Sequence, residues 1–327
     1  MEFWLPLIFA AVMGLSLLMY VILDGYDLGV GLLLPFADDA EKDHMVGSIG
    51  PFWDANETWI VLGVGVLLVA FPDAHGLVLT TLYLPAILML MALVLRGIAF
   101  DFRIKAHSNQ KKRWNLIFSG GSLVAALAQG WMLGAYVTGL RPGGIGLLFS
   151  VLVSLSLPAL YVMLGAAWLQ AKTAAPLRHK ARLWGRVAWL PMGLCLLLLS
   201  IATPLVSPAI AAKWFNFPQL FYLAPVPLLA LGAYTLLGLR LFSAQEGSRW
   251  LPFALLVLLC VLAAGGLGYS LYPDIVLGRI TLFEAAAASN TLMFTLWGVL
   301  ITLPCIIGYT IFVYRIFRGE LGAQHYS

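Results

Sequence analysis

Charged residues are scarce in this 327-residue sequence: Asp, Glu, Lys and Arg make up only 10% of it, against about 25% in an ordinary soluble domain. Hydrophobic residues make up 61%, and the mean hydropathy is +0.93. A compact soluble fold of this length has too little interior to bury so much apolar surface. The composition therefore excludes a soluble enzyme, a nucleic-acid-binding protein and a secreted disulfide-rich protein, and it indicates an integral membrane protein.

Cysteine and histidine are also sparse where a redox centre would need them. The three cysteines, Cys195, Cys260 and Cys305, are far apart within apolar segments, so we interpret them as small core residues. A haem or copper ion inside the membrane would need ligands within the apolar segments, but all five histidines lie outside them. Because CxxC, HExxH and phosphate-binding glycine motifs are absent from the sequence, we predict no metal site and no catalytic residue in this chain. The histidines are His44, His75, His107, His179 and His325.

Nine apolar segments are each long enough to cross a bilayer, which takes about 20 residues in a helix. They are continuous and show no alternation of polar and apolar residues, so we expect helices rather than strands. The N-terminus lacks the basic segment of a signal peptide, and the first segment is expected to remain as a span. We predict an all-α polytopic membrane protein with a single integral-membrane domain over 1–327. The predicted helices are 5–23, 53–71, 77–99, 116–138, 146–169, 187–206, 220–242, 252–272 and 291–314.

The distribution of Lys and Arg among the loops predicts the orientation. Of the 19 such residues, 15 fall on one side of the predicted membrane, and Arg141, Lys213 and Arg279 fall on the other. Since basic loops stay in the cytoplasm, we expect the C-terminus in the cytoplasm and, with nine spans, the N-terminus outside. The alternation of the spans puts the first predicted loop, 24–52, on the cytoplasmic side. This loop is acidic, but acidic residues contribute little to orientation, so the assignment stands.

Acidic residues gather at predicted helix ends that share the cytoplasmic side. Asp24 and Asp27 follow the first helix, and Asp54 and Glu57 begin the second. Residues three apart lie on one face of a helix, and two dehydrated carboxylates so close cannot both ionise easily, so such a pair can hold and pass on a proton. We interpret these four acids as candidates for a proton path. The alternatives are acids that complement a helix dipole and a solvated helix end.

Arg96, near the end of the third predicted helix, is the basic counterpart of these acids. It is either the counter-charge of one of them or a side chain that extends to the lipid headgroups. Trp53 and Asn56 flank the acids and are candidate members of the same polar cluster. Asp101 and Arg103 follow Arg96 and are further candidate charge partners.

Two further patterns concern packing and the membrane surface. Gly25 and Gly29 have the small-xxx-small spacing that allows two helices to approach closely. Arg103, Lys105 and the basic run 111–113 are expected to form a loop that faces lipid headgroups.

At these motifs the sequence resembles subunit II of the cytochrome bd-type quinol oxidases, including their cyanide-insensitive relatives. The resemblance is detailed over about the first 105 residues and continues as a match of hydropathy along the rest. Tyr26 and Ala55 stand where many relatives have Phe and Gly. Residues 272–273 and the alanine-rich run before Asn290 match less closely. The main matching stretches are 24–31 (DGYDLGVG), 50–59 (GPFWDANETW), 71–72 (FP) and 96–105 (RGIAFDFRIK).

The resemblance implies a non-haem subunit that pairs with a larger, haem-bearing subunit I in the bacterial cytoplasmic membrane. Subunit I of that family holds haems b and d, or haem b alone, and the quinol-oxidising loop. The complex reduces oxygen to water with electrons from quinol, takes protons from the cytoplasm and so generates a proton gradient. Lipids, a structural quinone and a small single-helix accessory subunit are further expected partners, and no residue here is assigned to the quinone.

Within this resemblance, Asp54 matches a family position in a proton-conducting path. The gathering of acids at one face extends that role to Asp24, Asp27 and Glu57. Two other interpretations remain. A proton-coupled secondary transporter would also place acids and Arg96 inside an apolar bundle, although the polar residues lie at one face rather than at the midplane. A purely structural or assembly subunit would tolerate changes at Asp54.

Overall fold

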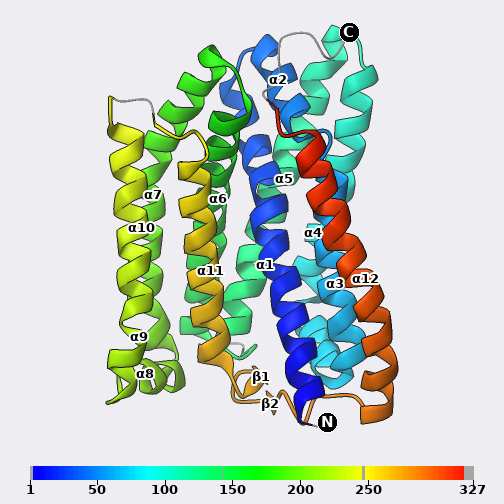
Figure 1. Ribbon diagram of the computed structural model, residues 1–327, viewed down its shortest axis with the longest axis vertical. Coiled ribbons are helices and arrows are strands. Elements are labelled where there is room, and N and C mark those ends of the chain that lie inside the picture. Colours follow the sequence, from blue (N-terminus) through cyan, green and yellow to red (C-terminus); the bar gives the residue numbers. More distant parts are fainter. Residues whose placement is uncertain (1–2, 142, 245–246, 320–327) are drawn as a thin grey trace.

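The computed structural model describes residues 3–141, 143–244 and 247–319, which form a bundle of upright helices (Figure 1). Within those ranges, nine helices are long and apolar enough to cross a membrane. Each predicted helix overlaps one of them, so the prediction of an all-α, multi-pass membrane protein is confirmed. The nine are α1 (Trp4–Leu33), α3 (Trp53–Ala70), α4 (Pro72–Lys105), α5 (Ser108–Val137), α6 (Gly144–Lys172), α7 (Ala175–Val206), α10 (Pro225–Phe242), α11 (Leu251–Leu271) and α12 (Ser289–Ile316).

Two short features mark the two ends of the bundle. Helix α2 (Asp39–Ile49) lies at the top of Figure 1, and a hairpin of β1 (Asp274–Val276) and β2 (Ile280–Thr281) lies at the bottom. We call these the α2 end and the hairpin end. Helix α1 begins at the hairpin end and α12 finishes at the α2 end (Figure 1). The remaining short helices are η1 (Leu34–Phe36), α8 (Pro208–Phe215) and α9 (Gln219–Leu223).

The hairpin is antiparallel, with Asp274 opposite Thr281 and Val276 opposite Ile280. Its turn contains Gly278, whose φ of +64° is a left-handed conformation that glycine adopts without strain. The Asp274 carboxylate accepts a hydrogen bond from the backbone N–H of Gly278 at 2.7 Å. No apolar pattern in the sequence predicts this hairpin, because such short strands are fixed by turn chemistry rather than by burial of a face.

Several predicted helix ends are wrong, and the differences bear on the polar residues. Helix α1 continues beyond residue 23 to Leu33, so Asp24 and Asp27 lie inside the helix rather than after it. Helix α4 likewise continues through Arg103 to Lys105. Aspartate and glycine have low helix propensity in water, but within a bundle neighbouring helices can pair the carboxylates and pack closely against the glycines.

The predicted loop 24–52 is also wrong, because most of it is helical. Helix α2 begins with a capping box, in which the Asp38 carboxylate accepts from the backbone N–H of Glu41 at 2.8 Å and the Glu41 carboxylate accepts from that of Asp38 at 2.9 Å. Acidic residues at the first turn also complement the helix dipole. The sequence Asp-x-x-Glu at 38–41 is a readable signal for this helix start.

Helices α1 and α6 cross in backbone contact at two glycines. A methyl group on Gly29 would overlap the carbonyl oxygen of Tyr161, and one on Gly165 would overlap the backbone of Gly29. A methyl group on Gly25 would lie 2.8 Å from the ring of Tyr161. The small-xxx-small spacing of Gly25 and Gly29 therefore marks a close helix crossing, as the sequence predicts.

Helix α4 is kinked at Leu82, whose φ and ψ of −106° and 17° are not helical. Pro85 explains this kink, since it lacks an N–H and its ring clashes with the carbonyl four residues earlier. The kink lies toward the hairpin end and leaves the other half of α4, which carries Arg96 and Arg103, as a regular helix.

The outer helices expose mostly apolar side chains. In the most apolar 18-residue stretch of α7 only 6% of the residues are buried, and in those of α10 and α12 the share is 11%. Cys260 is buried, as predicted, and Cys195 is partly buried. Cys305 is exposed, so its interpretation as a core residue is wrong. It lies on α12, an outer helix whose apolar residues face outward instead of packing in a core.

Candidate functional site

Side chains from α1, α3 and α4 meet inside the bundle in a cluster of five polar residues, Asp24, Asp27, Asn56, Glu57 and Arg96, which we call the buried charge cluster. The guanidinium of Arg96 donates through Nη2 to Asp24 Oδ1 and, at 2.9 Å, to Glu57 Oε1. The amide of Asn56 donates to Asp27 Oδ2 at 2.8 Å. The three helices thus bring acids to one buried arginine that lies 72 positions from Asp24 and 39 positions from Glu57 in the sequence.

Burial makes this cluster costly unless its charges are balanced. Asp24, Asp27 and Asn56 are fully buried, Arg96 is 1% exposed, and the side chain of Glu57 is 26% exposed. Three carboxyl groups face a single guanidinium, so ionisation of all three would leave two uncompensated negative charges in a poorly solvated site. Binding a proton at a carboxyl group is the least costly way to neutralise such an excess. The cluster is therefore suited to hold and transfer protons.

Some buried atoms of the cluster can form further hydrogen bonds. Among the residues that the structure describes, Asp24 Oδ2 and Asp27 Oδ1 are buried without a hydrogen-bond partner, and so are Nε and Nη1 of Arg96. Buried polar groups in proteins are normally paired, and exceptions are concentrated at functional sites. Each of the two buried aspartates thus has one oxygen already engaged and one that can take a proton.

The structure brings some of the sequence-predicted residues together and separates others. Asp24, Asp27, Asn56, Glu57 and Arg96 come together in the buried charge cluster. Arg96 lies between two carboxyl groups, as the counter-charge interpretation predicts, and its side chain does not extend to the surface.

Asp54, Asp101 and Trp53 lie outside this cluster. The two aspartates are exposed, and neither forms a hydrogen bond or ion pair with a residue in the described ranges. Trp53 is half-buried and packs its ring against Phe100, with the ring centroids 5.0 Å apart. The three-residue spacing of Asp54 and Glu57 does not reveal that Asp54 is exposed while Glu57 bonds the buried Arg96.

Sequence reasoning missed the tyrosines that surround the buried acids. The Tyr26 hydroxyl accepts from the Asn56 amide at 2.8 Å, and the Tyr314 hydroxyl donates to Asn56 Oδ1 at 3.2 Å. On the other side of the cluster, Gln129 donates to Tyr20 at 2.7 Å and accepts from Tyr161 at 2.5 Å. A tyrosine in an apolar helix carries no local signal of its partner, so only the fold brings these hydroxyl groups to the cluster.

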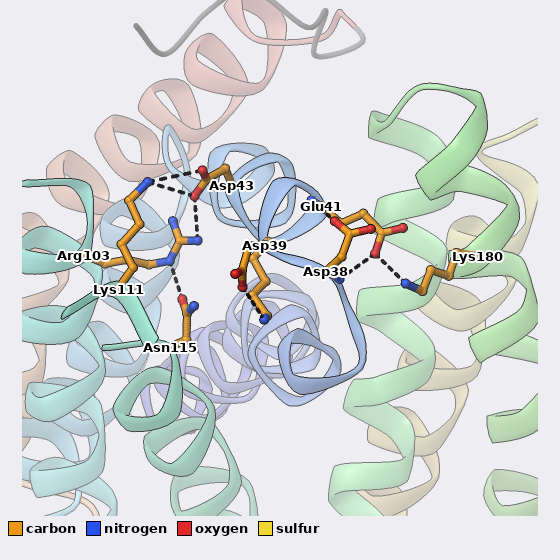
Figure 2. Close-up of polar contacts among 9 residues, drawn as sticks. Asp38, Asp39, Glu41, Asp43, Arg103, Lys111, Asn115 and Lys180 are labelled. Carbon is orange, nitrogen blue, oxygen red and sulfur yellow. Dashed lines mark hydrogen bonds and ion pairs between the residues drawn. The ribbon is translucent and has the colours of Figure 1, made fainter. Parts of the chain in front are cut away.

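A second polar network fixes α2 against the rest of the bundle (Figure 2). Asp43 accepts from Arg103 Nη2 at 2.7 Å and from Lys111 Nζ at 3.2 Å, and Asn115 accepts from Arg103 Nε at 2.5 Å. On the opposite side of α2, Glu41 accepts from Lys180 at 2.5 Å (Figure 2). The acids of α2 therefore neutralise basic residues of α4, α5 and α7, which accounts for an acidic segment among basic ones.

This network corrects the prediction that Arg103 belongs to a lipid-facing loop. Arg103 is only 4% exposed and is paired with Asp43 of α2. At the exposed start of α2, Lys42 bonds Asp39 and holds the pKa of that carboxyl group below its ordinary value. The basic residues at this end thus serve partly to hold α2 and not solely to meet lipid.

Substitution of Asp43 by Asn is expected to destabilise the protein by about 1 kcal/mol, because Arg103 would lose the carboxylate it is paired with while remaining buried. Thermal unfolding of the purified protein would measure this change. Asp39→Asn, which removes a carboxylate from an exposed pair of the same helix, is the control and should leave the unfolding temperature nearly unchanged. Equal effects of the two substitutions would contradict the role given to the Asp43–Arg103 pair.

Lys172, at the end of α6, has no carboxylate partner among the described residues. Its ammonium group lies over the rings of Phe52, Trp168 and Trp250, at 5.2, 5.3 and 5.8 Å from their centroids, and donates to the backbone carbonyl of Phe317 just beyond α12. Ring faces attract cations, and a basic group at a helix C-terminus satisfies its last carbonyls. Lys172 thereby anchors the end of α12 at the α2 end of the bundle.

None of the four histidines in the described residues lies in the middle of a membrane-spanning helix. His44 is in α2, His75 is in the first turn of α4, His107 precedes α5 and His179 is near the start of α7, while His325 lies outside the described residues. Within the described ranges, no group of three or more His, Cys, Asp or Glu side chains is arranged to hold a metal ion.

The fold and the buried charge cluster define a multi-pass helical membrane protein that holds more acid than base inside its bundle. A family model described as cytochrome bd terminal oxidase subunit II matches residues 5–317, almost the whole chain. The chain therefore belongs to the cytochrome bd terminal oxidase subunit II family. This finding confirms the family that the sequence motifs indicate.

Individual proteins show the same relationship. The chain is 25% identical over 321 residues to cytochrome bd ubiquinol oxidase subunit 2 of Bacillus subtilis, covering 92% of each chain. It is 26% identical over 355 residues to cytochrome bd-I ubiquinol oxidase subunit 2 of Escherichia coli K12, covering 94% of this chain and 93% of the relative. Its fold is similar to a chain of the bd oxidase from Geobacillus thermodenitrificans, with a TM-score of 0.74, 20% identity and coverage of 96% and 98%.

Proposed function

We propose that this chain is the non-haem subunit of a bd-type terminal quinol oxidase, which reduces oxygen to water with electrons from quinol. In this proposal it supports a larger, haem-bearing subunit I and contributes a path by which protons enter from the cytoplasm. The observation that carries the proposal is the buried charge cluster, with its excess of carboxyl groups over guanidinium, in a chain of this family.

The order of the acids supports a path from the surface inward. Asp54 is exposed on α3, and Glu57, three residues further along, is partly exposed and bonded to Arg96. Arg96 in turn bonds the fully buried Asp24, and Asp27 lies three residues further along α1. A proton that reaches Asp54 can therefore pass to Glu57 and then to the buried aspartates, with Arg96 compensating their charge.

The position of Asp54 also indicates which face of this chain meets its partner. An exposed carboxylate on a membrane-spanning helix is costly against lipid. Contact with another subunit that supplies polar groups or water removes this cost. We therefore place subunit I against the face of α3 that carries Asp54.

Orientation and setting complete the proposal. The concentration of basic residues at the α2 end supports an orientation with that end and the C-terminus in the cytoplasm and the N-terminus outside. The membrane is then the bacterial cytoplasmic membrane. Haem b and haem d, or haem b alone, belong to subunit I and supply the electron transfer and oxygen chemistry. A structural quinone, bound lipids and a small single-helix accessory subunit are further partners in this proposal.

Gentle purification of the tagged chain from its native membrane tests the assembly. We expect a larger partner to co-purify, and the reduced-minus-oxidised spectrum to show b-type and d-type bands or b-type bands alone. A stable, colourless chain recovered by itself would contradict the oxidase assignment. Proton-coupled solute uptake by that isolated chain in liposomes would then favour a secondary transporter.

Substitution of Glu57 by Gln or of Asp54 by Asn is expected to slow oxygen consumption on the order of a hundredfold, the lower range for loss of a positioned proton-transfer group. The haem spectrum should stay unchanged, since neither side chain is expected to touch a haem. Asp101→Asn, which neutralises another exposed acid near the same end, is the matched control and should keep full activity. Full activity of both path variants with a normal spectrum would remove these acids from the proton path.

A further inference from the structure

Asn56 is held by a closed ring of three hydrogen bonds. Its amide nitrogen donates to the Tyr26 hydroxyl at 2.8 Å, the Tyr26 and Tyr314 hydroxyls lie 2.5 Å apart, and the Tyr314 hydroxyl donates to Asn56 Oδ1 at 3.2 Å. Because the Tyr314 hydrogen goes to Asn56 Oδ1, Tyr26 is the donor in the bond between the two hydroxyl groups. Each hydroxyl therefore donates once and accepts once.

This ring fixes which end of the Asn56 amide faces Asp27. The oxygen and nitrogen of an asparagine side chain are distinguished by their hydrogen-bond partners. With Oδ1 engaged by Tyr314, Nδ2 is turned toward Asp27 and donates to its Oδ2 at 2.8 Å. A flipped amide would set its carbonyl oxygen against the Asp27 carboxylate, where two acceptors would repel each other.

The ring is rigid because aromatic packing holds both tyrosines. Tyr26 stacks on Trp168 with the ring centroids 4.0 Å apart, and Tyr314 packs against Phe52 at 4.6 Å. Tyr314 comes from α12, an outer helix that is otherwise little buried. It is thus the contribution of the last membrane span to a cluster built by the first three.

We propose that Tyr314 is a positioning residue for Asp27: through Asn56 it keeps an N–H donor on the Asp27 carboxylate and so favours the ionised form that can accept a proton. The proposal rests on the proton path of the proposed function and extends it to α12. A hydrogen bond donated to a carboxylate stabilises its charged form. Loss of the Tyr314 hydroxyl would leave Asn56 Oδ1 without its donor, so that only the bonds donated to Leu23, Tyr26 and Asp27 would hold the amide, and the bond to Asp27 would weaken.

The other ionisable groups around Asp27 stay in place when this hydroxyl is removed. Asp24 on α1, Glu57 on α3 and Arg96 on α4 are charged groups that act on Asp27, whereas Tyr314 bonds Tyr26 and Asn56. Tyr20 of α1 and Tyr161 of α6 face Asp24 instead. A change in the titration of Asp27 in Tyr314→Phe would therefore show that the hydrogen bond from the Asn56 amide to Asp27 has weakened.

The test is the pH dependence of oxygen consumption by the purified oxidase complex carrying Tyr314→Phe. We expect the acid limb to move by about one pH unit toward higher pH, as loss of one charge-assisted hydrogen bond implies. The rate at the optimum and the haem spectrum should change little. Tyr309→Phe, an exposed tyrosine of the same helix, is the matched control and should leave the profile unchanged.

A second variant and a second readout separate this proposal from the proposed function. Tyr26→Phe opens the same ring from the other side and should displace the limb in the same direction. Infrared spectra with carbon-13-labelled aspartate, assigned by Asp27→Asn, should show more protonated Asp27 at a given pH in Tyr314→Phe. That infrared change without any change in activity would uphold the positioning role and contradict the proton path. An unchanged infrared band and an unchanged pH profile in both ring variants would overturn the positioning role itself.

Discussion

Arg96→Met is expected to prevent stable assembly of the protein. The substitution leaves Asp24 fully buried without its counter-charge and removes the partner of Glu57. Breaking a buried ion pair by removing one partner costs about 3–5 kcal/mol, because an uncompensated charge stays in a poorly solvated site. The measurement is the yield and the unfolding temperature of the complex purified from membranes.

Two comparisons make this result specific to the buried charge cluster. Arg141→Met removes the same group from an exposed site at the hairpin end, where Arg141 donates to the carbonyl of Gly278, and should assemble normally. Combining Arg96→Met with Asp24→Asn and Glu57→Gln removes the charges together and should restore assembly without restoring activity. Normal assembly of Arg96→Met alone would show that the acids are neutral without the arginine and would contradict its role as counter-charge.

Gly29→Ala is the second substitution with a large expected effect, a destabilisation of about 3 kcal/mol at the upper end of the range for overpacking. The added methyl group would overlap the carbonyl oxygen of Tyr161, which is backbone of α6 and cannot rotate away. Helices α1 and α6 would have to separate, and Asp24 and Asp27 would move with α1. Thermal unfolding of the purified complex would measure the loss.

Gly14→Ala is the matched control for this substitution, since it lies on the same helix and a methyl group there meets no atom within 4 Å. Its stability should be unchanged or slightly raised, because alanine favours helix more than glycine does. If both variants unfold at the temperature of the parent protein, the two helices can separate locally without cost, and the close crossing is not needed for stability.

The spans could be predicted from the sequence because they depend on local composition. A run of apolar residues long enough to cross a bilayer has few alternatives to a helix, since its backbone must satisfy its own hydrogen bonds. The end of α1 could not be predicted in this way. Asp24, Gly25 and Asp27 are typical of a helix end in water, and only their contacts with α3, α4 and α6 keep the helix intact there.

The site was predictable in its composition but not in its geometry. The gathering of acids with Arg96 followed from the rule that charges near a membrane span are costly and need partners. Which acids face inward depends on where each helix lies in the bundle, so Asp54 and Glu57 could not be told apart from their spacing. Tyr314 lies 258 positions from Asn56, and no local pattern connects the two.

The contacts of Lys172 hold the end of α12 in a way that does not depend on the charge state of the buried acids. Among the described residues, the partners of Lys172 are three ring faces and a backbone carbonyl, none of which changes charge between pH 5 and 8. An anchor built on a carboxylate would weaken each time that carboxylate was neutralised. The last turn of α12, and with it the hydroxyl of Tyr314, can therefore keep its place while nearby carboxyl groups gain and lose protons, so repeated turnover need not shift the helix.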